Sequence, residues 1–292
     1  MTTPLVALSI AGTDSGGAAG LAADLATFAA LGAHGACAVT AVTAQDTTGV
    51  SRVVTLSADD VRAQVEAVLG DLPVGAVKTG MLGSAEIAAV VAGISGMPVV
   101  VDPVLTATSG ARLGSDELVA AYREVVLPVA TVTTPNRDEA VRLTGLDPRA
   151  PAVELAVALH ALGPAVVLTG GDPDAARCGD VVVESSGAVT VLEHDTVRTH
   201  NDHGTGCTFS AALAVHLGNG ADLLTATRRA QAFVSAALAT SSTWELGRGR
   251  GPVAHVSVPH HQENRCSCTP TTAPSTARDR ARTSPSRSPG SP

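Results

Sequence analysis

The chain has 292 residues, enough for one large α/β domain or two small ones, and either could bury a substantial core. Its formal net charge is −8 and no wide basic face is evident, which argues against nucleic acid as the main partner. The N-terminus lacks a basic leader and no apolar run reaches the ~18 residues that spanning a bilayer requires, so we expect neither secretion nor a membrane partner.

The five cysteines, Cys37, Cys178, Cys207, Cys266 and Cys268, are an odd number with no spacing typical of a metal site. Cys266 and Cys268 are separated by a single residue, so we expect no zinc there. Because unpaired thiols persist where glutathione and thioredoxin keep them reduced, we expect a cytoplasmic protein.

Strands and helices alternate along most of the chain. Short apolar or β-branched runs predict strands at 5–10, 36–44, 50–56, 74–77, 98–101, 130–133, 165–168, 181–183 and 189–192. Helical spacing, often with a capping residue, predicts helices at 21–31, 57–69, 84–91, 115–126, after 134–139, and at 151–162, 205–217 and 222–240. Glycine-rich or polar segments predict loops at 13–20 and 45–49.

This alternation favours a mostly parallel central sheet with helices on both faces, a three-layer αβα fold. The runs 181–183 and 189–192 are expected to form a hairpin. Polar residues then gather where strands end, and in such a sheet those points lie along one rim, so a single cleft could collect them.

The pattern stops near residue 257. The 36 residues from 257 to 292 hold six prolines and, among large aliphatic side chains, only Val258. Such a segment cannot bury enough surface to offset the entropy of ordering. We therefore expect one domain over 1–256 and a disordered tail over 257–292.

A tight turn at Gly204-Thr205-Gly206 precedes an Ala/Leu-rich helix. Free N–H groups at such a helix start, together with the helix dipole, form an anion site suited to a phosphoryl group. Cys207 falls in the first helical turn, where the same field is expected to lower its pKa and favour the thiolate. The plainer alternatives are an ordinary strand-to-helix turn and an inert buried cysteine.

Six motifs occur in order: AGTDSGGAAGLAADL at 11–25, TAQDT at 43–47, KTGML at 78–82, DPV at 102–104, TPN at 134–136 and HGTGCT at 203–208. Together they resemble the hydroxymethylpyrimidine/phosphomethylpyrimidine kinases of thiamine biosynthesis, members of the ribokinase-like superfamily. The resemblance covers about residues 5–255. It implies ATP-dependent phosphorylation of 4-amino-5-hydroxymethyl-2-methylpyrimidine and of its monophosphate, giving the diphosphate.

The resemblance also implies a substrate site. Gln45 would read the edge of the pyrimidine, since an amide offers a donor and an acceptor together. The other residues implied at the pyrimidine are Gly12, Asp24, Met81 and Val104. For Asp24, in the first turn of a helix, complementation of the helix dipole at the surface is an equally plain alternative.

For catalysis, the resemblance makes Cys207 the base and the amides of Gly204, Thr205, Gly206 and Cys207 the groups that stabilise the transferring phosphoryl. Asn136, Thr169 and Gly171 would bind the nucleotide. Mg²⁺ would bridge the ATP phosphates, with Asp102, Asn136 and Glu139 as nearby oxygen donors and the two carboxylates as its ligands. Asn136 and Glu139 also fit a capping box at a helix start.

The sequence departs from the family at two positions near the phosphates. Threonines stand at Thr108 and Thr169 where the family commonly has lysine. The loss of two cations leaves room for a catalytically weak, pyrimidine-binding regulatory protein, and pyridoxal/pyridoxine kinase is the alternative enzyme. A homodimer is expected in either case.

Overall fold

The computed structural model describes residues 3–106, 110, 113–170 and 177–256. Thr108, Gly171 and the 257–292 tail lie outside the described residues.

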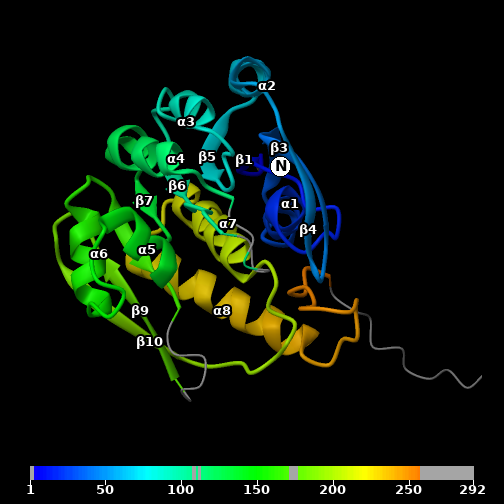
Figure 1. Ribbon diagram of the computed structural model, residues 1–292, viewed down its shortest axis with the longest axis vertical. Coiled ribbons are helices and arrows are strands. Elements are labelled where there is room, and N and C mark those ends of the chain that lie inside the picture. The colour runs from blue at the N-terminus through cyan, green and yellow to red at the C-terminus, as the bar shows by residue number, and fades with distance from the viewer. Residues whose placement is uncertain (1–2, 107–109, 111–112, 171–176, 257–292) are drawn as a thin grey trace, which may run out of the picture. The chain divides into compact units, whose positions relative to one another are not determined.

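Eight strands form a central sheet in the order β10-β9-β8-β7-β6-β5-β1-β2 (Figure 1). All neighbouring strands are parallel except the pairs that β9 makes with β8 and β10, so the prediction of a mostly parallel sheet is confirmed. The expected hairpin is β9 and β10. The strands are β1 (Val6–Ala11), β2 (His34–Val39), β5 (Val74–Thr79), β6 (Val99–Val101), β7 (Val132–Thr133), β8 (Ala165–Leu168), β9 (Arg177–Val183) and β10 (Val189–Asp195).

Helices cover both faces of this sheet, which completes the three predicted layers. One face carries α1 (Gly20–Ala30), α7 (Thr205–Gly218) and α8 (Leu223–Ser241). The other carries α2 (Ala58–Asp71), α3 (Ala85–Val91), α4 (Asp116–Ala121), α5 (Arg137–Thr144) and α6 (Ala152–His160). No helix within the described ranges combines the length and the apolar character that crossing a membrane would need.

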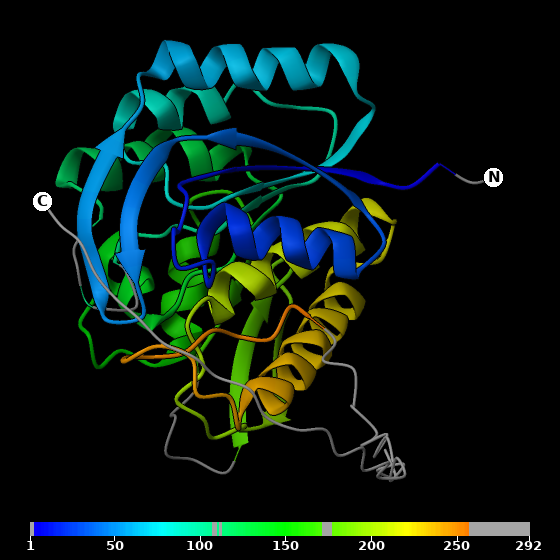
Figure 2. The same ribbon diagram turned by 90° about the vertical axis from the view of Figure 1, so that its right-hand side faces the viewer.

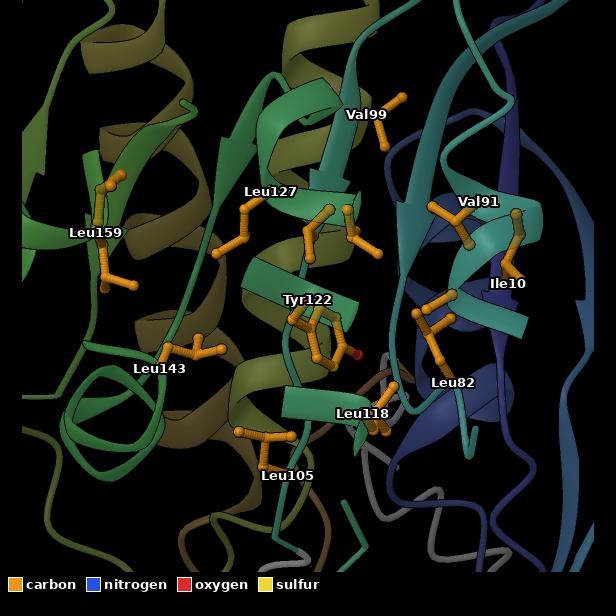
Figure 3. Packing of buried hydrophobic residues seen from close by; sticks show 14 of the residues in the cluster. Ile10, Leu82, Val91, Val99, Leu105, Leu118, Tyr122, Leu127, Leu143 and Leu159 are labelled. Carbon is orange, nitrogen blue, oxygen red and sulfur yellow. The ribbon is translucent and has the colours of Figure 1, made fainter. Parts of the chain in front are cut away.

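The two cores follow from the alternation of side chains along each strand. In β6, Val99 and Val101 point to the core on the side of α2–α6, whereas Val100 points to the core beneath α7 and α8. Tyr122 is fully buried in the first of these cores, among the aliphatic side chains in Figure 3. A strand that is buried on both faces needs no polar residue, which is why β6 reads as three consecutive valines.

Side-chain caps fix the helix starts. Ser57, Ser84, Ser115 and Asp222 each accept a hydrogen bond from the backbone amide three residues later, at the starts of α2, α3, α4 and α8. The helix expected over 115–126 is less regular than predicted. It passes from α4 into a π-helical segment, Tyr122–Val126, and then a 3₁₀ turn, Leu127–Val129, that contains Pro128.

The strand expected over 36–44 is two strands. The chain turns at Thr40, whose amide donates to the Ala11 carbonyl and whose hydroxyl donates to the Met81 carbonyl. The end of β1 and the loop after β5 therefore hold Thr40 in place. Beyond Thr40, β3 (Ala41–Asp46) leaves the central sheet and pairs with β4 (Gly49–Thr55) as a separate antiparallel hairpin (Figure 2). Gln45 therefore lies on a strand, not in the polar loop predicted at 45–49.

Candidate active site

A cavity of about 930 Å³ opens where β1, β5, β6, β7 and β8 end and α7 begins. The predicted site residues that line it are Gly12, Gln45, Met81, Asp102, Val104, Asn136, Glu139, Thr169, Gly204, Thr205, Gly206 and Cys207. Segments far apart in the sequence thus converge on one space, as expected from the rule that parallel strands end at one rim.

The turn at Gly204 is built for close approach. Gly204 has φ 86°, in the left-handed region, and a Cβ there would overlap the carbonyl oxygen of Ala18. Ala18 lies on the first loop, residues 12–19 between β1 and α1. The Thr205 amide donates to the Asp202 carbonyl at 3.3 Å, whereas the Gly206 and Cys207 amides have no partner among the described residues. Two donors of α7 are consequently available to an anion.

The protonation state of Cys207 differs from the thiolate expected from the sequence. Burial raises the pKa of its thiol to about 12, and although the Lys78 ammonium opposes this, the Asp102 and Asp24 carboxylates add to it. The helix dipole does not overcome that burial, so the resting group is a thiol and not the expected thiolate. The Gly20 amide and the Asp102 carboxyl are the polar neighbours of its sulfur.

A buried ion pair lies behind Cys207. Lys78, the single lysine of the chain, has its Nζ 2.9 Å from both oxygens of Asp24 and 3.8 Å from Oδ2 of Asp102. Burial alone would lower the pKa of Lys78, but the Asp24 carboxylate raises it, so the ammonium stays charged. Ser9 and Ser210 donate hydroxyl hydrogen bonds to Asp24 and Asp102.

Asp24 therefore differs from both of its predicted roles. It is fully buried, which excludes a surface role in dipole complementation, and it is not among the residues that line the cavity. The structure places it one layer behind the wall, as the partner of Lys78. Sequence reasoning missed Lys78 because nothing local to the KTGML motif shows which carboxylate faces its ammonium.

Asp14 and His203 form a second group that the motifs contained but to which sequence reasoning gave no role. Asp14 accepts hydrogen bonds from the amides of Gly16, Ala18 and Ala19, at 2.8–3.0 Å, and so shapes the first loop. Burial alone would raise the pKa of Asp14, but the hydrogen bonds from His203 and from the Gly16 and Ala19 amides lower it below its ordinary value. His203, next to Gly204, was recognisable as a polar residue at the start of the turn that precedes α7.

At the far end of the cavity, Asn136 and Glu139 form the expected capping box of α5. Asn136 Oδ1 accepts from the Glu139 amide at 2.9 Å, and Glu139 Oε2 accepts from the Asn136 amide at 3.0 Å. Burial and the nearby Asp102 raise the pKa of Glu139 to about 8. The hydroxyl of Thr169, also on the wall, donates to the Pro135 carbonyl at 3.4 Å.

The carboxylates suit a metal that arrives with a nucleotide better than a metal held by the protein alone. Within the part of the chain that the structure describes, no three His, Cys, Asp or Glu side chains are grouped as a metal site. Asp102 and Glu139 nevertheless both face the cavity, and Mg²⁺ is commonly bound by one or two carboxylates plus substrate phosphates. Arg198 and Arg250, which sequence reasoning missed, also line the cavity, and Arg250 forms an ion pair there with Asp202.

Comparison with known proteins adds independent information. The family model described as phosphomethylpyrimidine kinase matches residues 14–254. A hydroxymethylpyrimidine/phosphomethylpyrimidine kinase of Rhizobium meliloti is 45% identical over 257 residues, covering 86% of this chain and 96% of that protein.

Solved structures show the same fold. A Staphylococcus aureus pyridoxal kinase in complex with AMP-PCP and pyridoxal matches with a TM-score of 0.77 and 32% identity, covering 87% of this chain and 94% of that one. A Clostridium difficile phosphomethylpyrimidine kinase matches with a TM-score of 0.69 and 32% identity, covering 80% and 99%.

Proposed function

The chain belongs to the phosphomethylpyrimidine kinase family, and from this we propose that it uses ATP to phosphorylate hydroxymethylpyrimidine and then its monophosphate in thiamine biosynthesis. The observation that carries the proposal is one cavity shared by Gln45, a reader of a heteroaromatic ring, and Cys207 at the amide-bearing start of α7. A ring, a hydroxyl and a phosphoryl group can be held together only where such groups converge.

Cys207 is the group that handles the proton of the alcohol. The alcohol oxygen bonds to the γ-phosphorus, the bond from that phosphorus to the bridging oxygen breaks, and ADP leaves. Asp102 neighbours the thiol, so in this proposal Sγ takes the alcohol proton while the thiol proton passes to that carboxylate. The Gly206 and Cys207 amides stabilise the charge on the phosphoryl oxygens.

The nucleotide lies toward Asn136 and Thr169 in this proposal, with Gly171 beyond the described residues. Asp102 and Glu139 are the carboxylates that would hold Mg²⁺, which neutralises phosphate charge when it is bound. Gly12, Met81 and Val104 give the pyrimidine a largely apolar wall.

The test is a coupled assay of ADP release with hydroxymethylpyrimidine and with its monophosphate. The wild-type protein releases ADP with both substrates, and Cys207→Ala lowers kcat by about 10²–10⁴-fold. Cys37→Ala, on β2 outside the cavity lining, is the matched control and keeps full activity. Absence of ADP release with either pyrimidine, or full activity of Cys207→Ala, contradicts the proposal.

Pyridoxal kinase is the second candidate, because pyridoxal kinases share this fold at over 30% identity. Competition between pyridoxal and hydroxymethylpyrimidine for phosphorylation separates the two, and a higher kcat/KM for pyridoxal would favour the second. A regulatory protein that only binds pyrimidine would bind hydroxymethylpyrimidine without releasing ADP, and Cys207 would be dispensable.

The homodimer, the cytoplasmic setting and the division into a 1–256 kinase domain and a 257–292 tail stay predictions. Sedimentation of the full chain tests the dimer.

A further inference from the structure

Gln45 is held unusually firmly for a residue near the tip of a hairpin. The β3–β4 register shifts between Ala44 and Gln45, an irregularity that re-aims the side chain. Ser15, on the first loop, donates its hydroxyl to the Gln45 carbonyl at 2.7 Å and accepts from the Gln45 amide at 2.8 Å. Both the carbonyl and the amide of the Gln45 main chain are therefore hydrogen-bonded to the first loop.

The side chain of Gln45 is fixed as well. Its amide Nε2 lies 2.9 Å from Nε2 of His203, and that same His203 atom lies 3.3 Å from Oδ2 of Asp14. His203 and Asp14 are both buried, at 6% and 7% exposure, so water does not take over these contacts. Gln45, His203 and Asp14 thus form one polar chain that joins the hairpin, the α7 turn and the first loop.

The Asp14 carboxylate settles which atom of His203 carries hydrogen. An ionised carboxylate can only accept, so the ring nitrogen beside it must be Nε2–H. The Nδ1 atom of His203 is buried with no partner among the described residues, which suits a bare lone pair better than an N–H group. Both observations select the same tautomer.

The tautomer in turn selects the orientation of Gln45. A protonated Nε2 of His203 has no lone pair, so it cannot accept from the Gln45 amino group 2.9 Å away, whereas an oxygen at that place could share the hydrogen that Nε2 directs toward Asp14. The oxygen and nitrogen of a side-chain amide have nearly the same shape, so a half-turn of the amide places Oε1 against His203. Gln45 lines the cavity, and in this orientation its oxygen is taken by His203, so the amino group is the part of the amide left for a ligand.

We propose that His203, held by Asp14, is a positioning residue that locks Gln45 with its amino group facing the cavity, so that the site selects a substrate ring with an acceptor nitrogen at that point. The inference rests on the proposed function, because it names how that site recognises the ring. A freely rotating amide would satisfy a donor or an acceptor equally, and selectivity would be lost.

The tautomer can be tested without any assay of activity. Long-range ¹H–¹⁵N spectra of histidine-labelled full chain, with His203 assigned by comparison with His203→Gln, should show hydrogen on Nε2 and a lone pair on Nδ1. A His203 ring with hydrogen on Nδ1 alone would overturn the proposal, whether or not the protein proves to be a kinase.

Kinetics test the consequence. His203→Leu keeps the bulk and removes the N–H, and should raise KM for hydroxymethylpyrimidine by about tenfold, the value of one hydrogen bond, without changing KM for ATP. His203→Gln restores an N–H near the same place and should restore KM. A general structural defect would instead raise both KM values and would persist in His203→Gln, and either result would overturn the positioning role.

The 3-deaza analogue of the substrate, which lacks the ring nitrogen next to the amino-bearing carbon, completes the cycle. The wild-type protein should lose about tenfold in kcat/KM on this analogue, and His203→Leu should show little further loss, because the nitrogen and His203 act through the same amide. Equal losses in both proteins would show that His203 does not orient Gln45 toward this nitrogen.

Discussion

At the scale of single residues, the cavity changes what its side chains can do. Cys207 lies in the first turn of α7, a position that by itself favours a thiolate, yet burial beside Asp102 and Asp24 raises its pKa to about 12. The HGTGCT motif was enough to find the cysteine. Its protonation could not be predicted, because Asp102 follows β6, Asp24 lies in α1 and Lys78 in β5, and only the fold brings them together.

The raised pKa of Cys207 predicts slow alkylation. Only the thiolate reacts with iodoacetamide, so the rate at Cys207 should still rise about tenfold per pH unit between pH 8 and pH 10, without a plateau. Peptide mass analysis after timed labelling measures this, with Cys37 followed in the same samples as the reference. A rate at Cys207 that levels off near pH 7 would show a stabilised thiolate instead.

The Lys78–Asp24 pair predicts a large effect on stability. Both side chains are fully buried, so Lys78→Met leaves a carboxylate without its partner and should lower the free energy of unfolding by about 3–5 kcal/mol. Denaturant melts measure this. The double variant Lys78→Met/Asp24→Asn should lose less than the sum of the single losses.

The exposed pair of Arg177 and Glu193, 3.1 Å apart, is the matched control for that experiment. Its side chains are 60% and 61% exposed, so Arg177→Gln should cost no more than about 1 kcal/mol. Similar losses at the two pairs would mean that burial does not set the cost.

At the scale of elements, the sequence pattern predicted those helices and strands whose formation depends on residues close together in the chain. The capped starts of α2, α3 and α8 and the buried strands β1, β5 and β8 were found within a few residues. The break at Thr40 was missed, because it depends on hydrogen bonds to Ala11 and Met81, which are distant in sequence. For the same reason the sequence did not reveal that Gln45 sits on a hairpin outside the main sheet.

The start of α7 gives a prediction at this scale. Gly204→Ala forces a Cβ into the Ala18 carbonyl and so displaces the amide donors, which should lower kcat by about 10²–10³-fold. Gly220→Ala, just beyond the other end of α7, is the control. Gly220 also has a positive φ, of 83°, but nothing lies within 4 Å of its Cβ position.

The control should therefore cost only about 1–2 kcal/mol of stability and leave kcat unchanged. Steady-state kinetics and thermal melts of both variants distinguish the effects. Equal kcat values in the two variants would show that the close contact between the α7 turn and the first loop is not needed for transfer.

At the scale of the whole molecule, the cavity lies at one rim of the sheet. It is lined by the first loop, the hairpin, the ends of the central strands and the segment around Arg250. Arg248 and Gly249 donate their amides to the hydroxyl of Thr47 at the hairpin tip, so the end of the domain is tied to the hairpin that carries Gln45. The expectation of a single cleft depended only on strand direction, and this is why it succeeded.

The extent of the family match predicts the outcome of truncation. The alignment with the Rhizobium meliloti kinase covers 96% of that protein with 86% of this chain, and the family model ends at residue 254. A chain ending at residue 256 should keep the kcat and KM of the full chain, with Tm changed by less than about 2 °C. Loss of activity on truncation would assign the last 36 residues a part in folding or catalysis.

Because the only lysine is buried, chemical modification of that lysine can report how often the folded protein opens. Lys78 has 0% of its side chain exposed, and it carries the only ε-amine of the chain. A reagent that acylates ε-amines therefore reacts only after the Lys78–Asp24 ion pair is broken. The amount of acyl group that accumulates at this one site over time therefore counts how often the native molecule opens that far.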